Sequence, residues 1–224
     1  MLRLAIFDVD GTLVDSQNAI VAAMDAAHAR AGIAPPERSA TLSIVGLSLR
    51  EAMAALHPAG GDALHAALVT HYKESFRALR EAGTGEADSP FFPGARDAVA
   101  RLDRAGWLLS IATGKARRGL DHMLDTHGLR PLFIGTQTAD DAPSKPHPAM
   151  VLNCLAATGA EARDAVMVGD TAFDMAMARA AGVRAIGVGW GYHPPERLAA
   201  AGAERVVADF AELEAVLGNP EAVP

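Results

Sequence analysis

The chain has 224 residues, of which 50% are hydrophobic and 21% are charged, and its formal net charge is −7. This composition is typical of a globular protein with a full hydrophobic core, and it excludes a disordered chain. An acidic chain repels phosphate backbones, so we expect no nucleic-acid partner. The single cysteine, Cys154, allows no disulfide within the chain, and no apolar run approaches the ~18 residues of a membrane span. We expect a cytoplasmic protein without membrane contact, and no signal peptide, because Asp8 and Asp10 interrupt the first apolar run.

The first predicted element is a short buried strand over residues 2–7, which ends at a turn containing Asp8, Asp10 and Gly11. Apolar residues then recur at helical spacing over 16–31, 39–56 and 61–82. No strand is predicted between residues 15 and 88. A stretch rich in glycine and proline near residues 83–93 indicates a domain boundary.

From residue 94 onward, predicted strands and helices alternate. The helices are expected at 94–105, 116–127, 147–158, 172–181 and 210–217, and the strands at 107–112, 132–135, 165–168, 184–188 and 205–208. Such alternation is typical of a doubly wound parallel sheet. We therefore predict an α/β fold with a Rossmann-like core formed by 1–14 and 89–224, and a helical domain at 15–88 inserted after the first strand.

Four loops that follow predicted strands carry polar side chains. In an open parallel sheet, ligands bind at the carboxyl ends of the strands, so these side chains are expected at one edge. Carboxylate oxygens select a hard cation such as Mg²⁺, and a hydroxyl, a backbone amide and a lysine suit a phosphoryl group. The pattern predicts metal-assisted phosphoryl transfer. The residues concerned are Asp8, Asp10, Thr113, Gly114, Lys145, Asp170 and Asp174.

Each of these loops also has a simpler interpretation when taken alone. Asp8 and Asp10 fit a tight turn, and Thr113 fits a helix N-cap. Lys145 fits a solvated loop lysine, and Asp170 fits a first-turn acid favoured by the helix dipole. The functional hypothesis depends on all four loops following strands of the same sheet.

The four segments DVDGT (8–12), ATGK (112–115), SKPHP (144–148) and GDTAFD (169–174) resemble the four motifs of the haloacid dehalogenase superfamily. The resemblance covers nearly the whole chain, and the helical insertion is similar to that superfamily's small cap domain. The longer stretches ATGKARRGLD, GDTAFDMAMARAAG and GVGWGYH are most similar to the phosphoglycolate phosphatase-like branch. The dehalogenases of the superfamily lack an acid at the place of Asp10, so its presence favours phosphate-ester chemistry.

The resemblance implies a role for each of these residues. Asp8 is implied as the nucleophile and Asp10 as the general acid and base. Mg²⁺ is implied as the cofactor, held by Asp8, the backbone carbonyl of Asp10, and Asp170. Further implied roles are phosphoryl binding by Thr113, Gly114 and Lys145, and orientation of Lys145 or a metal-bound water by Asp174.

Two further features concern the substrate. Arg50, at the start of a predicted helix in the insertion, is a candidate for reading a substrate carboxylate or second phosphate, although a solvated arginine is the simpler interpretation. Lys115, Arg117 and Arg118 lie in the first turn of a helix, where cations are disfavoured, so they either attract anions or form a solvated face.

The sequence therefore favours a Mg²⁺-dependent phosphatase of a small phosphorylated metabolite, with phosphoglycolate as the leading candidate. A phosphomutase of the β-phosphoglucomutase type, a receiver-like signalling module and a non-catalytic binding protein on the same fold are the alternatives. A monomer and a homodimer are equally compatible with the sequence.

Overall fold

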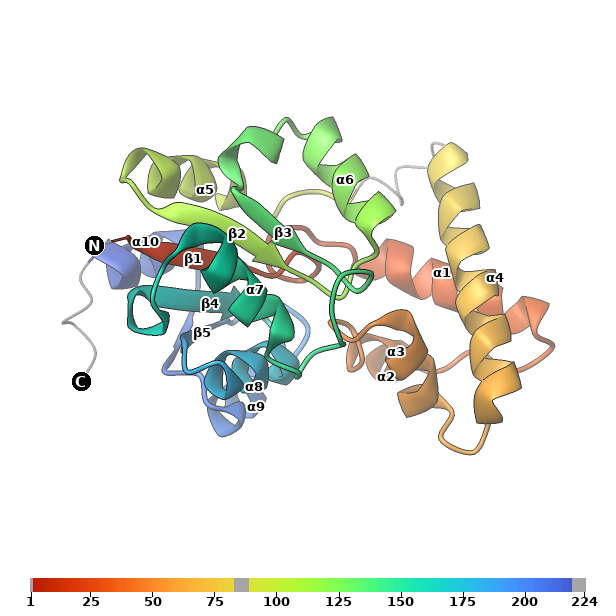
Figure 1. The fold of residues 1–224 in the computed structure, drawn as a ribbon. Coiled ribbons are helices and arrows are strands. Elements are labelled where there is room, and N and C mark those ends of the chain that lie inside the picture. Colours follow the sequence, from red (N-terminus) through yellow and green to blue (C-terminus); the bar gives the residue numbers. More distant parts are fainter. Residues whose placement is uncertain (1, 83–88, 219–224) are drawn as a thin grey trace.

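The computed structural model describes residues 2–82 and 89–218, and it contains a six-stranded parallel sheet in the order β3-β2-β1-β4-β5-β6 (Figure 1). The central strand β1 pairs on both sides, with Leu4 opposite Leu108 of β2 and Ala165 of β4. The strands are β1 (Leu4–Phe7), β2 (Leu108–Ala112), β3 (Gly135–Gln137), β4 (Ala165–Gly169), β5 (Arg184–Val188) and β6 (Arg205–Val207). The predicted α/β, doubly wound fold class is confirmed.

Helices cover both faces of the sheet because successive strand residues point to opposite sides. Ala5 and Phe7 of β1 pack on one face, under α5 (Ala95–Arg104), α6 (Arg117–Thr126) and α10 (Phe210–Gly218). Leu4 and Ile6 pack on the other face, under α7 (Ala149–Thr158), α8 (Ala172–Ala180) and α9 (Pro195–Ala201). With both faces covered, the strands are almost continuously apolar, which is why short apolar runs marked them in the sequence.

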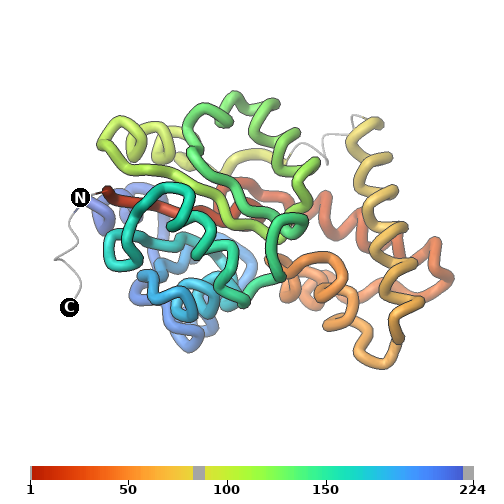
Figure 2. The backbone as a smooth tube through the Cα atoms, in the orientation of Figure 1, coloured from red at the N-terminus to blue at the C-terminus, as the bar shows by residue number. Residues whose placement is uncertain are grey.

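The segment between β1 and α5 forms a helical cap at one end of the molecule (Figure 2). It comprises α1 (Gln17–Arg30), α2 (Arg38–Leu42), α3 (Leu49–Leu56) and α4 (Gly61–Glu81). These helices have a small hydrophobic core of their own, built on Met24, Met53 and Leu68. The predicted cap boundary at residue 88 lies outside the described residues.

Several predicted elements differ from the structure. The helix predicted over 39–56 is two helices, because residues 43–48 form a loop in which Gly46 adopts a φ of 100°. The strand predicted at 132–135 is wrong: Arg130–Leu132 is a 3₁₀ turn, and β3 follows at Gly135–Gln137. Helix α9 is not among the predicted elements. Its first residue is Pro195, and proline is favoured at this position of a helix start.

Among the described residues, no helix combines the length and the apolar character needed to cross a membrane.

Candidate active site

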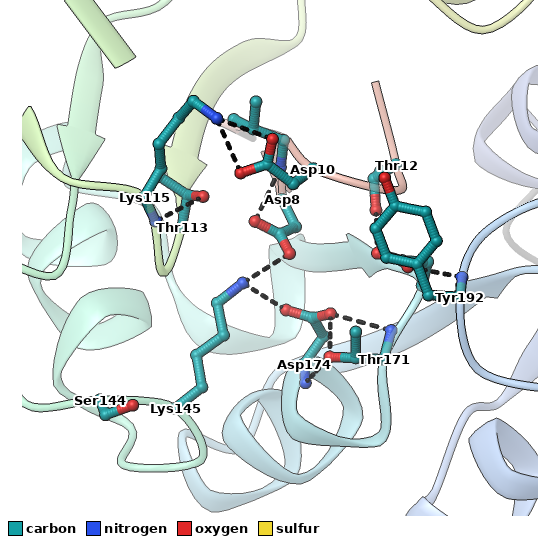
Figure 3. A network of polar contacts seen from close by, with 12 residues as sticks. Asp8, Asp10, Thr12, Thr113, Lys115, Ser144, Lys145, Thr171, Asp174 and Tyr192 are labelled. Carbon is teal, nitrogen blue, oxygen red and sulfur yellow. Dashed lines mark hydrogen bonds and ion pairs between the residues drawn. The ribbon is translucent and has the colours of Figure 1, made fainter. Parts of the chain in front are cut away.

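The four predicted loops meet at the carboxyl edge of the sheet (Figure 3). Asp8 and Asp10 follow β1, Thr113 follows β2, and Asp170 follows β4. Lys145 reaches the same place from the loop before α7, and Asp174 from the first turn of α8. The structure therefore brings together the acidic, hydroxyl and lysine side chains that the sequence singled out.

A buried ion cluster forms the centre of the site. The Lys145 Nζ atom lies 2.8 Å from Asp8 Oδ2 and 2.7 Å from Asp174 Oδ1, and all three side chains are at most 1% exposed. Burial raises the pKa of Asp8 to about 6, although the Lys145 ammonium acts in the opposite direction. The pKa of Lys145 is raised because the attraction of Asp174 and Asp8 outweighs the effect of burial. Lys145 is therefore a fixed positive charge in a dry environment.

Asp174 has both of its oxygens occupied by other groups. Its Oδ1 accepts from Lys145, and its Oδ2 accepts from the Thr171 hydroxyl at 2.7 Å and the Thr171 N–H at 3.1 Å. Thr171 also accepts from the Asp174 N–H, so the two residues form a capping box at the start of α8. These contacts fit the role expected of Asp174, which is to orient Lys145.

Asp170 is completely buried and is held by two donors from distant loops. Its Oδ1 accepts from the Thr12 hydroxyl at 3.0 Å, and its Oδ2 accepts from the Tyr192 N–H at 2.9 Å. A Cβ atom on Gly11 would lie 2.2 Å from Asp170 Oδ2, so only glycine allows the two loops to approach this closely. Burial raises the pKa of Asp170 well above its ordinary value, and the Asp8 carboxylate raises it further. Such a destabilised carboxylate is suited to a cation partner.

The acidic residues fit a divalent cation. Asp8, Asp170 and Asp174 each offer one carboxylate oxygen, and these atoms lie within 4.8 Å of one another. Asp8 Oδ2 is buried and receives no hydrogen bond of good geometry from the described residues. Carboxylate oxygens at this density are typical ligands of Mg²⁺, which would compensate their mutual repulsion.

Asp10 lies apart from this cluster and is paired with another lysine. The Lys115 Nζ atom donates to both Asp10 oxygens, at 2.7 Å and 2.9 Å (Figure 3). The Lys115 N–H in turn donates to the Thr113 hydroxyl oxygen at 3.2 Å, and Thr113 is buried. The sequence predicts either anion attraction or a solvated face for Lys115, and it does not predict the direct contact with Asp10.

The cap closes directly over this edge. The Ser48 N–H of the cap donates to the Ser144 hydroxyl at 2.9 Å, one residue before Lys145. His193 is buried, accepts from the Ala172 N–H at Nδ1, and contacts the Ser43 carbonyl of the cap through Nε2 at 3.0 Å. Because Nδ1 accepts, Nε2 carries the proton and donates to the cap. Neither contact was predicted, because each joins loops that are distant in the sequence.

A cavity of about 400 Å³ lies between cap and core, and Asp8, Asp10, Thr113 and Gly114 line it. Arg50 does not line this cavity: its side chain is exposed and pairs with Asp62 at 3.1 Å. Of the other three cations discussed, Lys115 and Arg118 line the cavity, whereas Arg117 pairs with Asp141 and Thr136 beside it. A volume of this size is in the range of small-molecule sites.

Fold and site together define an α/β enzyme with a capped acidic centre. The chain belongs to the haloacid dehalogenase-like hydrolase family, whose model matches residues 5–188. Its sequence is similar to a probable phosphatase, IndB, of Dickeya dadantii, at 37% identity over 95% of this chain and 92% of the relative. It is also similar to a phosphoglycolate phosphatase of Yersinia pseudotuberculosis, at 33% identity over 98% of this chain and 94% of the relative.

Solved structures share this fold. A hydrolase from Pseudomonas syringae superposes with a TM-score of 0.84 at 26% identity, covering 97% of this chain and 98% of that one. A structure described as a predicted phosphatase from Clostridium acetobutylicum superposes with a TM-score of 0.86 at 23% identity, covering 97% and 100%. On the family model and the sequence relatives, the chain is a hydrolase of this family, in its phosphoglycolate phosphatase-like branch.

Proposed function

We propose that this protein is a Mg²⁺-dependent phosphomonoesterase, which hydrolyses a small phosphorylated metabolite through an aspartyl-phosphate on Asp8. The observation that carries the proposal is the arrangement of two carboxylates in one cavity with different partners. Asp8 is buried against Lys145, whereas Asp10 is 13% exposed and held by Lys115. Two acids in such different surroundings are suited to different chemical roles.

In the first step, an Asp8 carboxylate oxygen attacks phosphorus, and the bond from phosphorus to the substrate's alcohol oxygen breaks. Asp10 gives its proton to that oxygen, and the alcohol leaves. In the second step, Asp10 takes a proton from water, and the water oxygen attacks the phosphorus of the aspartyl-phosphate. Inorganic phosphate leaves and the Asp8 carboxylate is restored.

The surrounding residues stabilise the charge of the phosphoryl group. Lys145 compensates the charge of Asp8 and of the phosphoryl oxygens, while the Thr113 hydroxyl and the Gly114 N–H donate to those oxygens. A Mg²⁺ ion held by Asp8, Asp170 and the backbone carbonyl of Asp10 would add a further positive charge there.

The Asp10–Lys115 ion pair suggests how the acid becomes protonated. In the free enzyme, Lys115 donates to both Asp10 oxygens. A bound phosphate dianion competes for Lys115, which releases Asp10 to take up the proton that it gives to the leaving alcohol.

Phosphoglycolate is the first single candidate, because several similar proteins are named phosphoglycolate phosphatases. Arg50 is a candidate for reading a substrate carboxylate or second phosphate, with a solvated arginine as the simpler interpretation. The candidate role requires the side chain to leave Asp62 and turn into the cavity.

The proposal is tested by phosphate release from phosphoglycolate, sugar phosphates, nucleoside monophosphates and pyridoxal phosphate, with Mg²⁺ and with EDTA. We expect Mg²⁺-dependent release from at least one compound. Transfer of the phosphoryl group to a second position of a sugar phosphate, without release, would instead support a phosphomutase. A stable phosphorylated protein without turnover would support a signalling module.

A further inference from the structure

The wall that the cap contributes to the active-site cavity is mostly apolar. Helices α1, α3 and α4 and the loop before α3 supply aliphatic and aromatic side chains, among them Ile20, Met24, Ile44, Leu49, Tyr72 and Phe76. The catalytic aspartates lie at the opposite, core side of the same cavity. The alcohol part of a bound phosphate ester therefore extends from a polar floor toward an apolar cap.

Two aromatic rings on α4 belong to this wall. The Tyr72 and Phe76 rings lie one helical turn apart, with centroids 5.9 Å from each other and planes inclined by 33°. The Lys115 Nζ atom is 5.8 Å from the centroid of the Phe76 ring, and the same atom donates to Asp10. The aromatic wall therefore lies beside the residue that protonates the leaving alcohol.

Tyr72 keeps this wall uncharged. Burial, together with the nearby Asp10 carboxylate, raises the pKa of Tyr72 well above its ordinary value. Its phenol stays protonated at any pH at which the enzyme would work.

Most cations at the cavity are either paired with a carboxylate or exposed to solvent. Lys115 is occupied by Asp10, and Lys145 by Asp8 and Asp174. Of the other four cations at the cavity, Lys73, Arg77 and Arg118 are exposed to solvent. The fourth, Arg80, is half-buried, and its guanidinium carbon lies 5.7 Å from the centroid of the Phe76 ring. An exposed cation interacts only weakly with an anion because water screens the attraction. The three exposed cations are better suited to attracting the phosphate dianion toward the mouth than to reading a carboxylate.

We propose that the preferred substrate is a phosphomonoester whose alcohol carries a flat, apolar ring, and that this ring stacks against Phe76 and Tyr72. This inference rests on the proposed phosphatase function, and it ranks a ring-bearing ester above phosphoglycolate, the candidate taken from the names of similar proteins. A ring gains affinity from the apolar area it removes from water and from contact with the aromatic faces. The two-carbon acid of phosphoglycolate has no apolar surface to cover this wall, and its carboxylate would lose hydration beside it.

The test compares four simple esters on the full-length protein with Mg²⁺: benzyl phosphate, cyclohexylmethyl phosphate, ethyl phosphate and phosphoglycolate. All four esters release a primary alcohol of similar leaving-group ability. Differences in kcat/KM therefore report how well the alcohol part of each ester binds. We expect benzyl phosphate to exceed ethyl phosphate and phosphoglycolate by about tenfold or more, with cyclohexylmethyl phosphate between them.

The variant Phe76→Leu keeps an apolar side chain but removes the ring. We expect it to lower the ratio of kcat/KM for benzyl over ethyl phosphate by about tenfold. Phe76→Ala, checked for folding by its melting temperature, should lower that ratio at least as much. Leu152→Ala serves as the control, because Leu152 is 46% exposed on α7 and does not line the cavity. It should leave kcat/KM for benzyl phosphate and for ethyl phosphate unchanged.

Two results would overturn the inference, and they differ in what else they affect. If phosphoglycolate or ethyl phosphate is hydrolysed as well as benzyl phosphate, or if Phe76→Leu leaves the ratio unaltered, the ring preference is wrong while the phosphatase function stands. If no ester releases phosphate, including the compounds of the broader panel above, the proposed function fails as well.

Discussion

Replacing Lys145 by methionine should destabilise the protein strongly, because it removes the one cation between two buried carboxylates. The Nζ atom is within 2.8 Å of Asp8 and 2.7 Å of Asp174, and Lys145 is 1% exposed. Breaking a buried ion pair from one side costs about 3–5 kcal/mol, because the remaining charge is left without compensation. A typical domain unfolds with only about 5–15 kcal/mol, so the variant should lose a large share of its stability.

The loss should depend on pH and on Asp174. The folded-state pKa of Lys145 is raised, so its stabilising contribution is fully present below the ordinary value of 10.5 and is lost only as pH rises through the higher folded value. In the variant, the unpaired carboxylates should take up protons as pH falls, so the deficit should be smaller at pH 5 than at pH 7.5. Adding Asp174→Asn to Lys145→Met should recover part of the lost stability, which a double-mutant cycle measures as coupling.

Urea denaturation of Lys145→Met, Asp174→Asn and the double variant in EDTA would provide these free energies. Lys73→Met is the control, since Lys73 is exposed and has no ion pair with the described residues; it should change stability by less than about 0.5 kcal/mol. A loss below about 1 kcal/mol in Lys145→Met, or strict additivity in the double variant, would refute this account of the cluster.

Three further predictions concern the cap and the metal. Gly114→Ala would place a Cβ atom 2.4 Å from the Gly46 carbonyl oxygen, so it should force the cap outward and lower kcat/KM by about 10²-fold. The control is Gly218→Ala, whose added Cβ atom meets open space and should leave kcat/KM unchanged. Equal kcat/KM values for the two variants would contradict the role of this contact. Burial raises the pKa of Asp8 to about 6, so the Mg²⁺ affinity measured by calorimetry should fall as pH drops from 7.5 to 5, and an unchanged affinity would argue against Asp8 as a ligand. Burial lowers the pKa of His193, so the stability that the neutral His193 side chain gives the folded protein should be lost as pH falls below the ordinary value of 6.5. If the melting temperature of His193→Gln depends on pH in the same way as that of the wild type, this prediction is wrong.

Much of the core was predictable because its signals are local. The strand β1 is a short apolar run that stops at an acidic turn, and each later strand of the core, except β3, has a similar run. Strand β3 is different because it is an edge strand made of polar and small residues. The apolar residues before it belong to a turn, which places the Phe133 side chain in the core. Period and hydrophobicity cannot separate these two uses of an apolar residue.

The site was predictable to the level of its residues but not of their contacts. The order of the strands determines that Asp8, Thr113 and Asp170 meet, because parallel strands end at one edge. The pairing of Lys115 with Asp10 is different, since it depends on a side-chain orientation that no spacing encodes. The loop at Gly46 separates α2 from α3, and it packs closely against Thr171: a Cβ atom added to Gly46 would lie 3.2 Å from the Thr171 hydroxyl oxygen. This contact between distant parts of the chain likewise could not be predicted from the sequence. The shape of the cap cavity is therefore a property of the folded chain alone.

The central claim is that Asp8 carries the phosphoryl group during turnover. The most direct measurement is to quench the enzyme during hydrolysis of its best substrate, reduce any acyl phosphate with borohydride, and identify the modified residue by mass spectrometry of the peptide containing Asp8. The account predicts a substrate-dependent conversion of Asp8 to homoserine, with no conversion at Asp10, and no phosphate release by Asp8→Asn. Sustained turnover without modification of Asp8, or an Asp8→Asn variant that retains activity, would contradict it.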